Sequence, residues 1–221
     1  MAPLTLGYWD IRGLAEPIRY LLHHNNVVFT DKRYSFTSGE WPKDKFNLDL
    51  DFPNLPYLFD GDVKITQSTT ILRYLAQKYG VDGKTQAEKL KVSMVEQQVV
   101  DLRWFLLMTT VFKENTEENR ASFREKAPDM LKSFEKFLGG RKFLVGDGVT
   151  YVDFLLSETF DFYRYYVPDV CKDFPTLMAH QARIVGLPGI KEYLNSPTYT
   201  RWPIVGPIAK FGGSGPEPKR D

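Results

Sequence analysis

At residues 50–57 the sequence reads Leu50-Asp51-Phe52-Pro53-Asn54-Leu55-Pro56-Tyr57, and this stretch decides the fold of the first third of the chain. Proline has no N–H for a sheet ladder, and it pushes the residue before it into an extended conformation. We therefore expect Leu55 to be extended at the entrance to a strand, with its own N–H and C=O unpaired. Such a backbone edge binds an extended peptide as an added strand. The Leu55–Pro56 bond is also a candidate for the cis form.

A second motif, Thr66-Gln67-Ser68, follows ten residues later and opens a helical pattern. A serine hydroxyl and the free N–H groups of a first helical turn together make an anion site. On its own, Ser68 would be an ordinary helix cap. Beside Leu55 and Pro56, it indicates a site that binds a peptide backbone at one end and a carboxylate at the other. The two motifs together predict a small acidic peptide as ligand.

The composition sets wide limits on the function. The chain has 221 residues, enough for one large domain or two small ones, with 29 basic and 28 acidic residues and a net charge of +1. This balance predicts neither nucleic acid nor an anionic membrane as partner. We also expect no membrane span and no secretory signal. The single cysteine, Cys171, fits a cytoplasmic location, where disulfides are rare.

The first part of the chain has a mixed strand and helix pattern, which predicts a small α/β domain over residues 1–82. The hairpin is signalled by Asp60-Gly61-Asp62, and Gly80 closes the last helix of this part. The expected elements are a strand at 4–8, a helix from 15–17 to about 24, a strand at 27–30, an irregular helical piece at 41–48, strands at 57–59 and 63–65, and a helix at 68–79.

After Gly80 the strand signal disappears, and the remainder predicts an all-α helical-bundle domain over residues 83–213. Thr85 is placed to cap a long helix whose buried seam recurs every three or four residues, at Val92, Val95, Val99, Leu102 and Leu106. Thr150 and Asp153 have the spacing of a capping box. Further helices are expected at 118–138, 150–166, 176–185 and 189–194, followed by a flexible tail at 214–221.

These residues carry a resemblance to a known family. Tyr8-Trp9-Asp10-Ile11-Arg12-Gly13, the stretch 50–57, Trp41 with Lys45, and Thr66-Gln67-Ser68 together resemble the mu class of the cytosolic glutathione S-transferases, from residue 3 to about 213. The Ser35–Glu40 segment is shorter than in vertebrate mu-class sequences, as in an invertebrate-like form, which suggests a more open pocket on that side. The resemblance implies a thioredoxin-like first domain, a helical second domain and a homodimer. The thioredoxin Cys-x-x-Cys motif is absent, which argues against disulfide exchange.

The resemblance also implies roles for individual residues. Tyr8 would be catalytic, donating its hydroxyl proton to the sulfur of glutathione, and Asp101 would reach the glutathione of the other subunit. Taken singly, Tyr8 is an amphipathic tyrosine and Asp101 a solvated helix carboxylate. The implied glutathione-binding residues are Tyr8, Trp9, Trp41, Lys45, Asn54, Leu55, Pro56, Gln67, Ser68 and Asp101.

A second implied set binds the other substrate and the second subunit. Phe112 would stand where the class carries a tyrosine that hydrogen-bonds the electrophile, so that epoxide and enone chemistry would be weak. Phe52 would insert into an apolar pocket of the other subunit, and Arg73 would line the same dimer interface. The implied electrophile pocket consists of Ile11, Leu14, Leu107, Met108, Phe112 and Val205.

The function implied is conjugation of glutathione, a cosubstrate, to small hydrophobic electrophiles, without a metal or other cofactor. His23 and His24 are adjacent and point to different helix faces, and His180 is isolated, so no metal site is expected. Two alternatives stay open: a glutathione-dependent isomerase of an endogenous lipid, and a non-catalytic carrier of hydrophobic ligands. The presence of Tyr8 argues against the carrier, which needs no thiol-activating hydroxyl.

Overall fold

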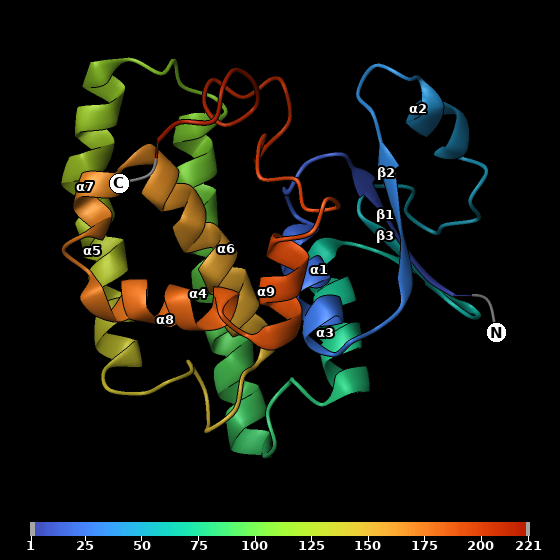
Figure 1. Cartoon of the computed structure of the whole chain (residues 1–221), viewed down its shortest axis with the longest axis horizontal. Coiled ribbons are helices and arrows are strands. Elements are labelled where there is room, and N and C mark those ends of the chain that lie inside the picture. Colours follow the sequence, from blue (N-terminus) through green and yellow to red (C-terminus); the bar gives the residue numbers. More distant parts are fainter. Residues whose placement is uncertain (1–2, 220–221) are drawn as a thin grey trace.

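A computed structural model describes residues 3–219, and its two parts are a small sheet-containing domain and a larger helical domain (Figure 1). The sheet has the strand order β2-β1-β3-β4. β1 is parallel to β2, whereas β1–β3 and β3–β4 are antiparallel. The mixed sheet and the helices packed on it confirm the expected thioredoxin-like fold. The strands are β1 (Leu4–Trp9), β2 (Phe29–Tyr34), β3 (Tyr57–Asp60) and β4 (Val63–Thr66).

The position of β2 differs from the expected strand at 27–30. The ladder begins with Leu4 opposite Phe29 and continues through polar residues to Trp9 opposite Tyr34. Val27 instead lies between the preceding helix and this strand, and its N–H donates to the Leu22 carbonyl of that helix at 3.0 Å. β2 lies at the sheet edge, where a strand is not buried on both faces, so its composition gave a poor signal.

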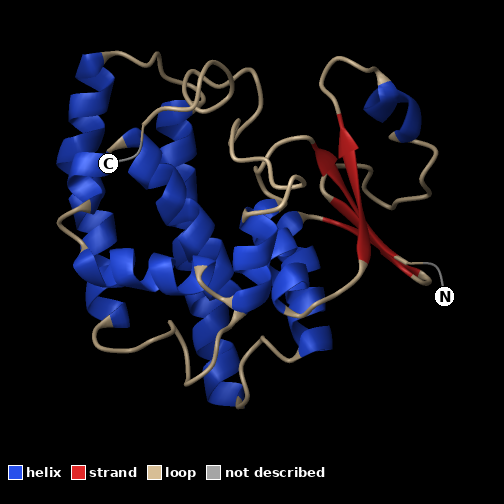
Figure 2. Cartoon of the chain, in the orientation of Figure 1, coloured by secondary structure: helices blue, strands red, loops and turns tan. Residues whose placement is uncertain are grey.

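Three helices accompany the sheet. α1 (Glu16–His24) and α3 (Ser68–Tyr79) lie between the sheet and the helical domain, whereas α2 (Glu40–Asp44) lies at the outer end of β2 (Figure 2). The expected helical piece at 41–48 is thus reduced to five residues, followed by turns. Ile71, Leu72, Leu75 and Ala76 on one face of α3 are buried, as the helical spacing predicts.

Within the described residues, the second domain consists of helices and connecting segments, without a strand. The seam of α4 is buried as predicted, with Val99, Leu102 and Leu106 fully covered. α7, which begins with Pro168, is a single extra turn that the sequence pattern did not reveal. The helices are α4 (Gln86–Thr110), α5 (Glu117–Leu138), α6 (Tyr151–Tyr166), α7 (Pro168–Cys171), α8 (Pro175–Val185) and α9 (Pro188–Leu194).

The predicted capping box at the start of α6 is present. The Asp153 carboxylate accepts the Thr150 N–H at 2.8 Å and the Thr150 hydroxyl at 2.9 Å. The same carboxylate accepts the Leu144 N–H at 2.9 Å and pairs with the His180 Nε2 atom at 2.8 Å. His180 is therefore a buried structural residue that joins α8 to the start of α6.

The two domains are joined by a buried ionic network around Arg12. Its guanidinium donates to both Glu158 oxygens at 2.9 and 2.6 Å and to Asp161 at 2.7 Å, and the Arg12 side chain is fully buried. Charged hydrogen bonds of this kind are short and strong. The network fixes the loop after β1 against α6.

The C-terminal segment returns to the same loop. The Gly13 N–H donates to the Ile204 carbonyl at 2.7 Å. Further on, the Trp202 indole donates to the Gly215 carbonyl at 2.9 Å, and Tyr165 bonds Glu217. Within the expected flexible tail at 214–221, Gly215 and Glu217 thus contact Trp202 and α6. Residues 220–221 of that expected tail lie outside the described part.

Candidate active site

Tyr8 lies in the last part of β1, and the loop that follows folds back over its ring. The Tyr8 side chain is 6% exposed, and its Oη atom accepts a hydrogen bond from the Leu14 N–H at 3.1 Å. Gly13 has a φ of +47°, and a Cβ atom there would lie 2.6 Å from the Tyr8 ring. Only glycine therefore permits the loop to approach the tyrosine so closely.

The environment of Tyr8 keeps its hydroxyl protonated. Burial raises the pKa of Tyr8 above its usual value, against the opposing effects of the Leu14 N–H and of Arg103. The oxygen already accepts one hydrogen bond, so its proton is available for a partner in the cavity. At neutral pH the group is a hydrogen-bond donor, the form that a thiolate partner requires.

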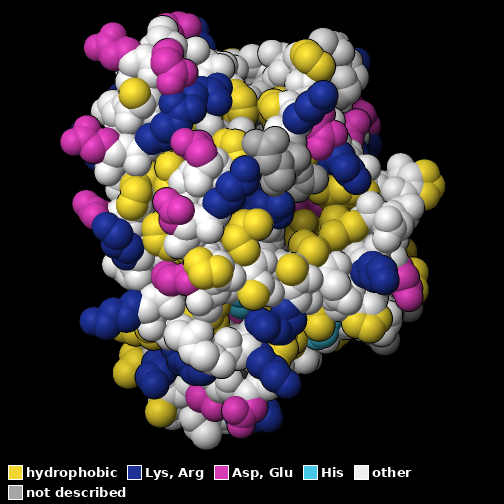
Figure 3. All heavy atoms as spheres, turned by 60° about the vertical axis from the view of Figure 1, so that its left-hand side comes forward, with side chains coloured by type: hydrophobic (Ala, Val, Ile, Leu, Met, Phe, Trp, Pro, Cys, Tyr) yellow, Lys and Arg dark blue, Asp and Glu magenta, His cyan; other side chains and the backbone are white. Residues whose placement is uncertain are grey.

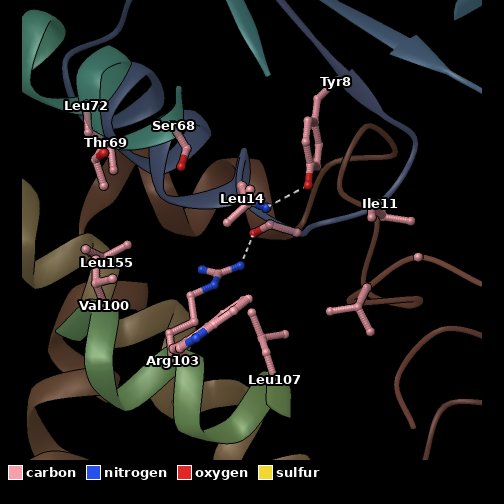
Figure 4. Close-up of a pocket in the computed structure, with 14 residues that line it drawn as sticks. Tyr8, Ile11, Leu14, Ser68, Thr69, Leu72, Val100, Arg103, Leu107 and Leu155 are labelled. Atoms are coloured by element: carbon pink, nitrogen blue, oxygen red, sulfur yellow. Dashed lines mark hydrogen bonds between the residues drawn. The ribbon is translucent and has the colours of Figure 1, made fainter. Parts of the chain in front are cut away.

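A cavity of about 290 Å³ opens beside Tyr8, between the two domains (Figure 4). Most of its wall is apolar, with Tyr8, Ser68, Thr69 and Arg103 as the polar side chains. Residues from the loop after β1 and from α3 form one side, and residues from α4, α6 and the C-terminal segment form the other. The lining residues are Tyr8, Ile11, Gly13, Leu14, Ser68, Thr69, Leu72, Val100, Arg103, Trp104, Leu107, Leu155, Val205 and Gly206.

The structure brings four of the six expected electrophile-pocket residues to this cavity: Ile11, Leu14, Leu107 and Val205. Met108 and Phe112 are 44% and 60% exposed, and neither lines it. Helix α4 ends at Thr110, so Phe112 has left the helical face that carries Leu107. The structure therefore does not place Phe112 in the cavity wall, as the expected pocket requires, and the expected effect of its missing hydroxyl on epoxide chemistry stays a prediction.

The Leu55–Pro56 bond is cis, as the sequence suggested, and both residues are buried. The expectation of an unpaired Leu55 N–H is wrong, because this group donates to the Asn54 Oδ1 atom at 2.9 Å. Asn54 itself is exposed. Its side-chain amide thus occupies the position at which the carbonyl of an added peptide strand would bind.

The start of α3 differs in detail from the predicted cap. Gln67 is the capping residue, and Ser68 is the first helical residue, without a side-chain capping bond. Gln67 has a φ of +72°, a conformation that is rare outside glycine and costs about 1–3 kcal/mol. Such strain is concentrated at ligand sites. Ser68 lies at the cavity together with Thr69, next to the free N–H groups of the first turn (Figure 4).

The remaining expected glutathione-binding residues lie in the sheet domain, except Asp101, which lies on α4. Trp41 is 7% exposed, with its ring stacked 6.4 Å from that of Tyr57. Lys45 follows α2, and within residues 3–219 no carboxylate pairs with its ammonium group. Trp9 stacks on Phe36 of the short 35–40 segment at 4.4 Å. Asp101 is exposed on α4.

Phe52 and Arg73, the expected interface residues, have different surroundings. Phe52 is 75% exposed, although its backbone is held by the Thr66 hydroxyl, which donates to the Phe52 carbonyl at 3.0 Å. Arg73 donates to the buried Glu96 carboxylate, through Nε at 2.8 Å, and this bond links α3 to α4. Arg73 therefore already has a role within one chain.

Sequence reasoning missed Arg103, a polar group in the cavity wall. Its Nη2 atom donates to the Gly13 carbonyl at 2.6 Å. Val100, Arg103, Trp104 and Leu107 recur at helical spacing and form the face of α4 next to the buried seam. An arginine within this second, mostly apolar stripe was the feature of the sequence that could have indicated Arg103 as a site residue.

Other kinds of site find no support in the described residues. Across residues 3–219, no three His, Cys, Asp or Glu side chains are grouped so as to hold a metal ion. None of the helices in that range combines the length and apolar composition that a membrane crossing requires. On the face shown in Figure 3, acidic and basic side chains are interspersed.

The sequence and the structure were compared with those of known proteins. A family model described as glutathione S-transferase, N-terminal domain, matches residues 4–77, and one described as glutathione S-transferase, C-terminal domain, matches residues 100–197. The chain is 43% identical over 215 residues to glutathione S-transferase Mu 1 of Mus musculus, which covers 95% of this chain and 98% of the relative.

Two further similarities extend the comparison. The class-mu 26 kDa glutathione S-transferase isozyme 51 of Fasciola hepatica is 40% identical over 217 residues, covering 98% of this chain and 99% of the relative. The solved structure of the glutathione S-transferase Blo t 8 matches with a TM-score of 0.86 at 38% identity, covering 94% of this chain and 99% of that one. The chain therefore belongs to the glutathione S-transferase family, and within that family to the mu class.

Proposed function

We propose that Tyr8 activates the thiol of glutathione in this transferase, and that the cavity beside it holds a hydrophobic electrophile. The observation that carries the proposal is the Leu14 N–H bond to Tyr8 Oη, at 3.1 Å, in a buried site. With one lone pair engaged and its pKa raised by burial, the phenol donates its proton toward the cavity. A sulfur placed there is stabilised as thiolate.

The magnitude of the required effect is attainable. A free thiol titrates near pH 8.5, and lowering its pKa by about two units requires roughly 2.7 kcal/mol in favour of the anion. One hydrogen bond to a charged group contributes about 1.5–3 kcal/mol. The N–H groups at the start of α3 add a favourable field for a nearby anion.

Glutathione would lie along the sheet domain in an extended conformation. Its cysteinyl carbonyl would replace the Asn54 side chain at the Leu55 N–H, and Asn54 would then support the peptide from outside. Pro56, cis to Leu55, sets the direction of this backbone edge. Gln67, whose backbone is strained, and Ser68 would bind the γ-glutamyl carboxylate.

The opposite end of the peptide needs donors for the glycine carboxylate. Trp41 offers an indole N–H, and Lys45 an ammonium group with no carboxylate partner in the described residues. Trp9 completes this binding surface from the end of β1. Asp101 of a second subunit would bind the glutamyl ammonium.

The reaction that this arrangement supports is nucleophilic attack by the bound thiolate. A carbon–sulfur bond forms, and the electrophile either releases a halide or opens a strained ring, after which the oxygen takes up a proton. The protein contributes thiol activation and proximity. No metal or prosthetic group is required, and glutathione is the cosubstrate.

The enzyme would work as a homodimer. A groove of about 160 Å³ between α4 and α5 matches the exposed Phe52 ring in apolar character, and we propose that each Phe52 inserts into this groove of the other subunit. The groove residues are Met94, Val95, Gln98, Ser133, Phe134 and Phe137. Arg73, on α3 beside α4, would line the same interface.

The division of labour follows the domain plan. We propose residues 1–82 as the glutathione-binding domain and residues 83–213 as the helical domain that supplies most of the electrophile pocket. The short 35–40 segment would leave the pocket accessible to bulky planar compounds, and a cytoplasmic location would suit a thiol substrate. Isomerisation of a lipid would use the same thiolate, whereas a pure carrier leaves the Tyr8 geometry without purpose.

The experiment that tests the function is binding to immobilised glutathione followed by conjugation of chlorodinitrobenzene. We expect retention on the column and turnover that depends on glutathione. Retention without turnover would support the carrier instead. Turnover restricted to a double-bond shift in a lipid would support the isomerase.

A further inference from the structure

The peptide group between Gly13 and Leu14 makes a hydrogen bond at each end (Figure 4). Its carbonyl oxygen, from Gly13, accepts a bond from the Arg103 guanidinium at 2.6 Å. Its N–H, from Leu14, donates to the Tyr8 hydroxyl oxygen at 3.1 Å. A cation in the second domain is thereby connected to the thiol-activating hydroxyl in the first through one amide.

An amide transmits charge between its two ends. Its C–N bond has partial double-bond character, because nitrogen shares its lone pair with the carbonyl. A cation bonded to the oxygen draws electron density toward that oxygen and leaves the N–H more positive. Chains of hydrogen bonds strengthen one another in this way in a low-dielectric environment. The Leu14 N–H therefore donates more strongly to Tyr8 than an unassisted amide would.

The consequence for Tyr8 concerns both direction and strength. A strong donor on one lone pair of the phenol oxygen leaves the O–H to point elsewhere, into the cavity. The same donor stabilises negative charge on the oxygen, which makes the phenol a better donor to a thiolate. Both effects favour the ionised thiol.

The surroundings of Arg103 indicate that it is not a structural ion pair. Within residues 3–219 no carboxylate lies at salt-bridge distance, and its Nε atom is buried without a hydrogen-bond partner. Burial lowers the pKa of Arg103, with Glu158, Tyr8 and Arg12 as the charged or titratable groups that act on it. Arg103 is partly buried, and a partly buried cation with one neutral acceptor has few interactions that offset its loss of water.

We propose that Arg103 is a positioning residue that acts on Tyr8 through the Gly13–Leu14 peptide group. In this way it lowers the pKa of the thiol of glutathione bound at the active site. The proposal rests on the function proposed for Tyr8. It does not depend on a contact of Arg103 with glutathione or with the electrophile, although Arg103 lines the cavity.

The first test compares Arg103→Met and Arg103→Lys with the unaltered enzyme. The readout is the ultraviolet absorbance of the bound thiolate as a function of pH. We expect Arg103→Met to raise the thiol pKa by about one unit, a tenfold loss of thiolate below the pKa, with little change in the affinity for glutathione. Arg103→Lys, which keeps the charge but loses the fork, should show a smaller rise. Lys91→Met removes an exposed cation from the same helix and should change nothing.

The second test repeats Arg103→Met in a Tyr8→Phe background. If the peptide group transmits the effect to the hydroxyl, the second substitution adds no further change in the thiol pKa. A persistent shift in the double variant would mean that Arg103 acts on the thiolate directly, which overturns the proposal. If Tyr8→Phe alone leaves the thiol pKa unchanged, the proposed function of Tyr8 fails first.

Two measurements keep the proposal testable if Arg103→Met does not fold. The amide proton of Leu14 in the unaltered enzyme should resonate downfield and should move upfield in Arg103→Lys. In that variant, kcat/KM should also fall by the same factor for an aryl chloride and for an epoxide, since only the thiolate population changes. An unmoved Leu14 resonance, or a loss confined to the epoxide, contradicts the proposal.

Discussion

Arg12 and Arg103 both contact or belong to the loop between Tyr8 and Leu14, yet their guanidinium groups have different hydrogen-bond acceptors. Arg12 meets two carboxylates, with bonds of 2.6–2.9 Å to Glu158 and Asp161. Arg103 meets one backbone carbonyl, at Gly13. Burial would lower the pKa of Arg12, but Glu158 and Asp161 outweigh it and raise the pKa, whereas burial prevails and lowers the pKa of Arg103.

The difference separates a scaffold from a working site. A buried guanidinium with matched carboxylates holds two domains together and has no capacity left for a ligand. A guanidinium with one neutral acceptor, at a cavity wall, still exerts its charge on its neighbours. The two arginines thus differ in how many hydrogen-bond acceptors and carboxylates they meet, and this difference corresponds to the two roles.

The largest expected effect is a loss of stability on substitution of Arg12, the arginine with two carboxylate partners. Arg12→Met leaves Glu158 and Asp161 without their main buried cation, and losing one partner of such a pair costs about 3–5 kcal/mol. The free energy of unfolding from denaturant titration measures it. Lys132→Met, on the surface of α5, is the control and should be near neutral. An Arg12→Met variant with an unchanged free energy of unfolding would contradict the structural role of Arg12.

Tyr8→Phe tests the working site. We expect kcat to fall about 10²-fold while glutathione affinity is retained, because the substitution removes only the hydroxyl. The pKa of the bound thiol should rise by about 1–2 units, from the loss of one charged hydrogen bond. Tyr74→Phe, whose hydroxyl bonds Asp60 at 2.8 Å away from the cavity, is the matched control. An unchanged thiol pKa in Tyr8→Phe would show that another group activates the sulfur.

Phe52→Ser tests an apolar group without a partner among the described residues of its own chain. The Phe52 ring is exposed, and the groove proposed to bind it belongs to the second subunit. We expect the dimer to dissociate at concentrations about 30-fold higher, for a loss of about 2 kcal/mol at an anchoring residue. Glutathione binding should weaken as well, because Asp101 is supplied across the interface. Sedimentation measures the first effect, and Val28→Ser, at another exposed apolar residue, is the control. A fully active Phe52→Ser monomer would contradict both expectations.

The last effect is the dependence of stability on pH through Glu158. Burial raises the pKa of Glu158 from 4.5 to about 7 in spite of Arg12, so the folded state binds its proton more tightly than the unfolded state does. Stability contributed by this group is therefore lost as the pH rises from about 4.5 to about 7, and is level above that window. The difference in unfolding free energy between the unaltered enzyme and Glu158→Gln should fall across this range. A difference that is flat or rises with pH would mean that Arg12 keeps the carboxylate ionised throughout.

The sequence alone determined the order of most of the elements and supplied the residues that we propose for the glutathione site. Local chemistry sufficed there: prolines at 53 and 56, a glycine after α3, the buried seam of α4 and the capping box at Thr150 act within one turn or one strand. The resemblance to the mu class added the role that we propose for Tyr8.

Tertiary structure decided what depends on residues far apart in the sequence. It carried β2 into the polar residues after Phe29, because pairing with β1 outweighs composition at a sheet edge. It placed Phe112 outside the cavity, because α4 ends two residues earlier. It also brought Arg103 to the Gly13 carbonyl, 90 residues away along the chain. Whether a charge is matched or left unmatched depends on which distant groups surround it, and only the folded chain determines those neighbours.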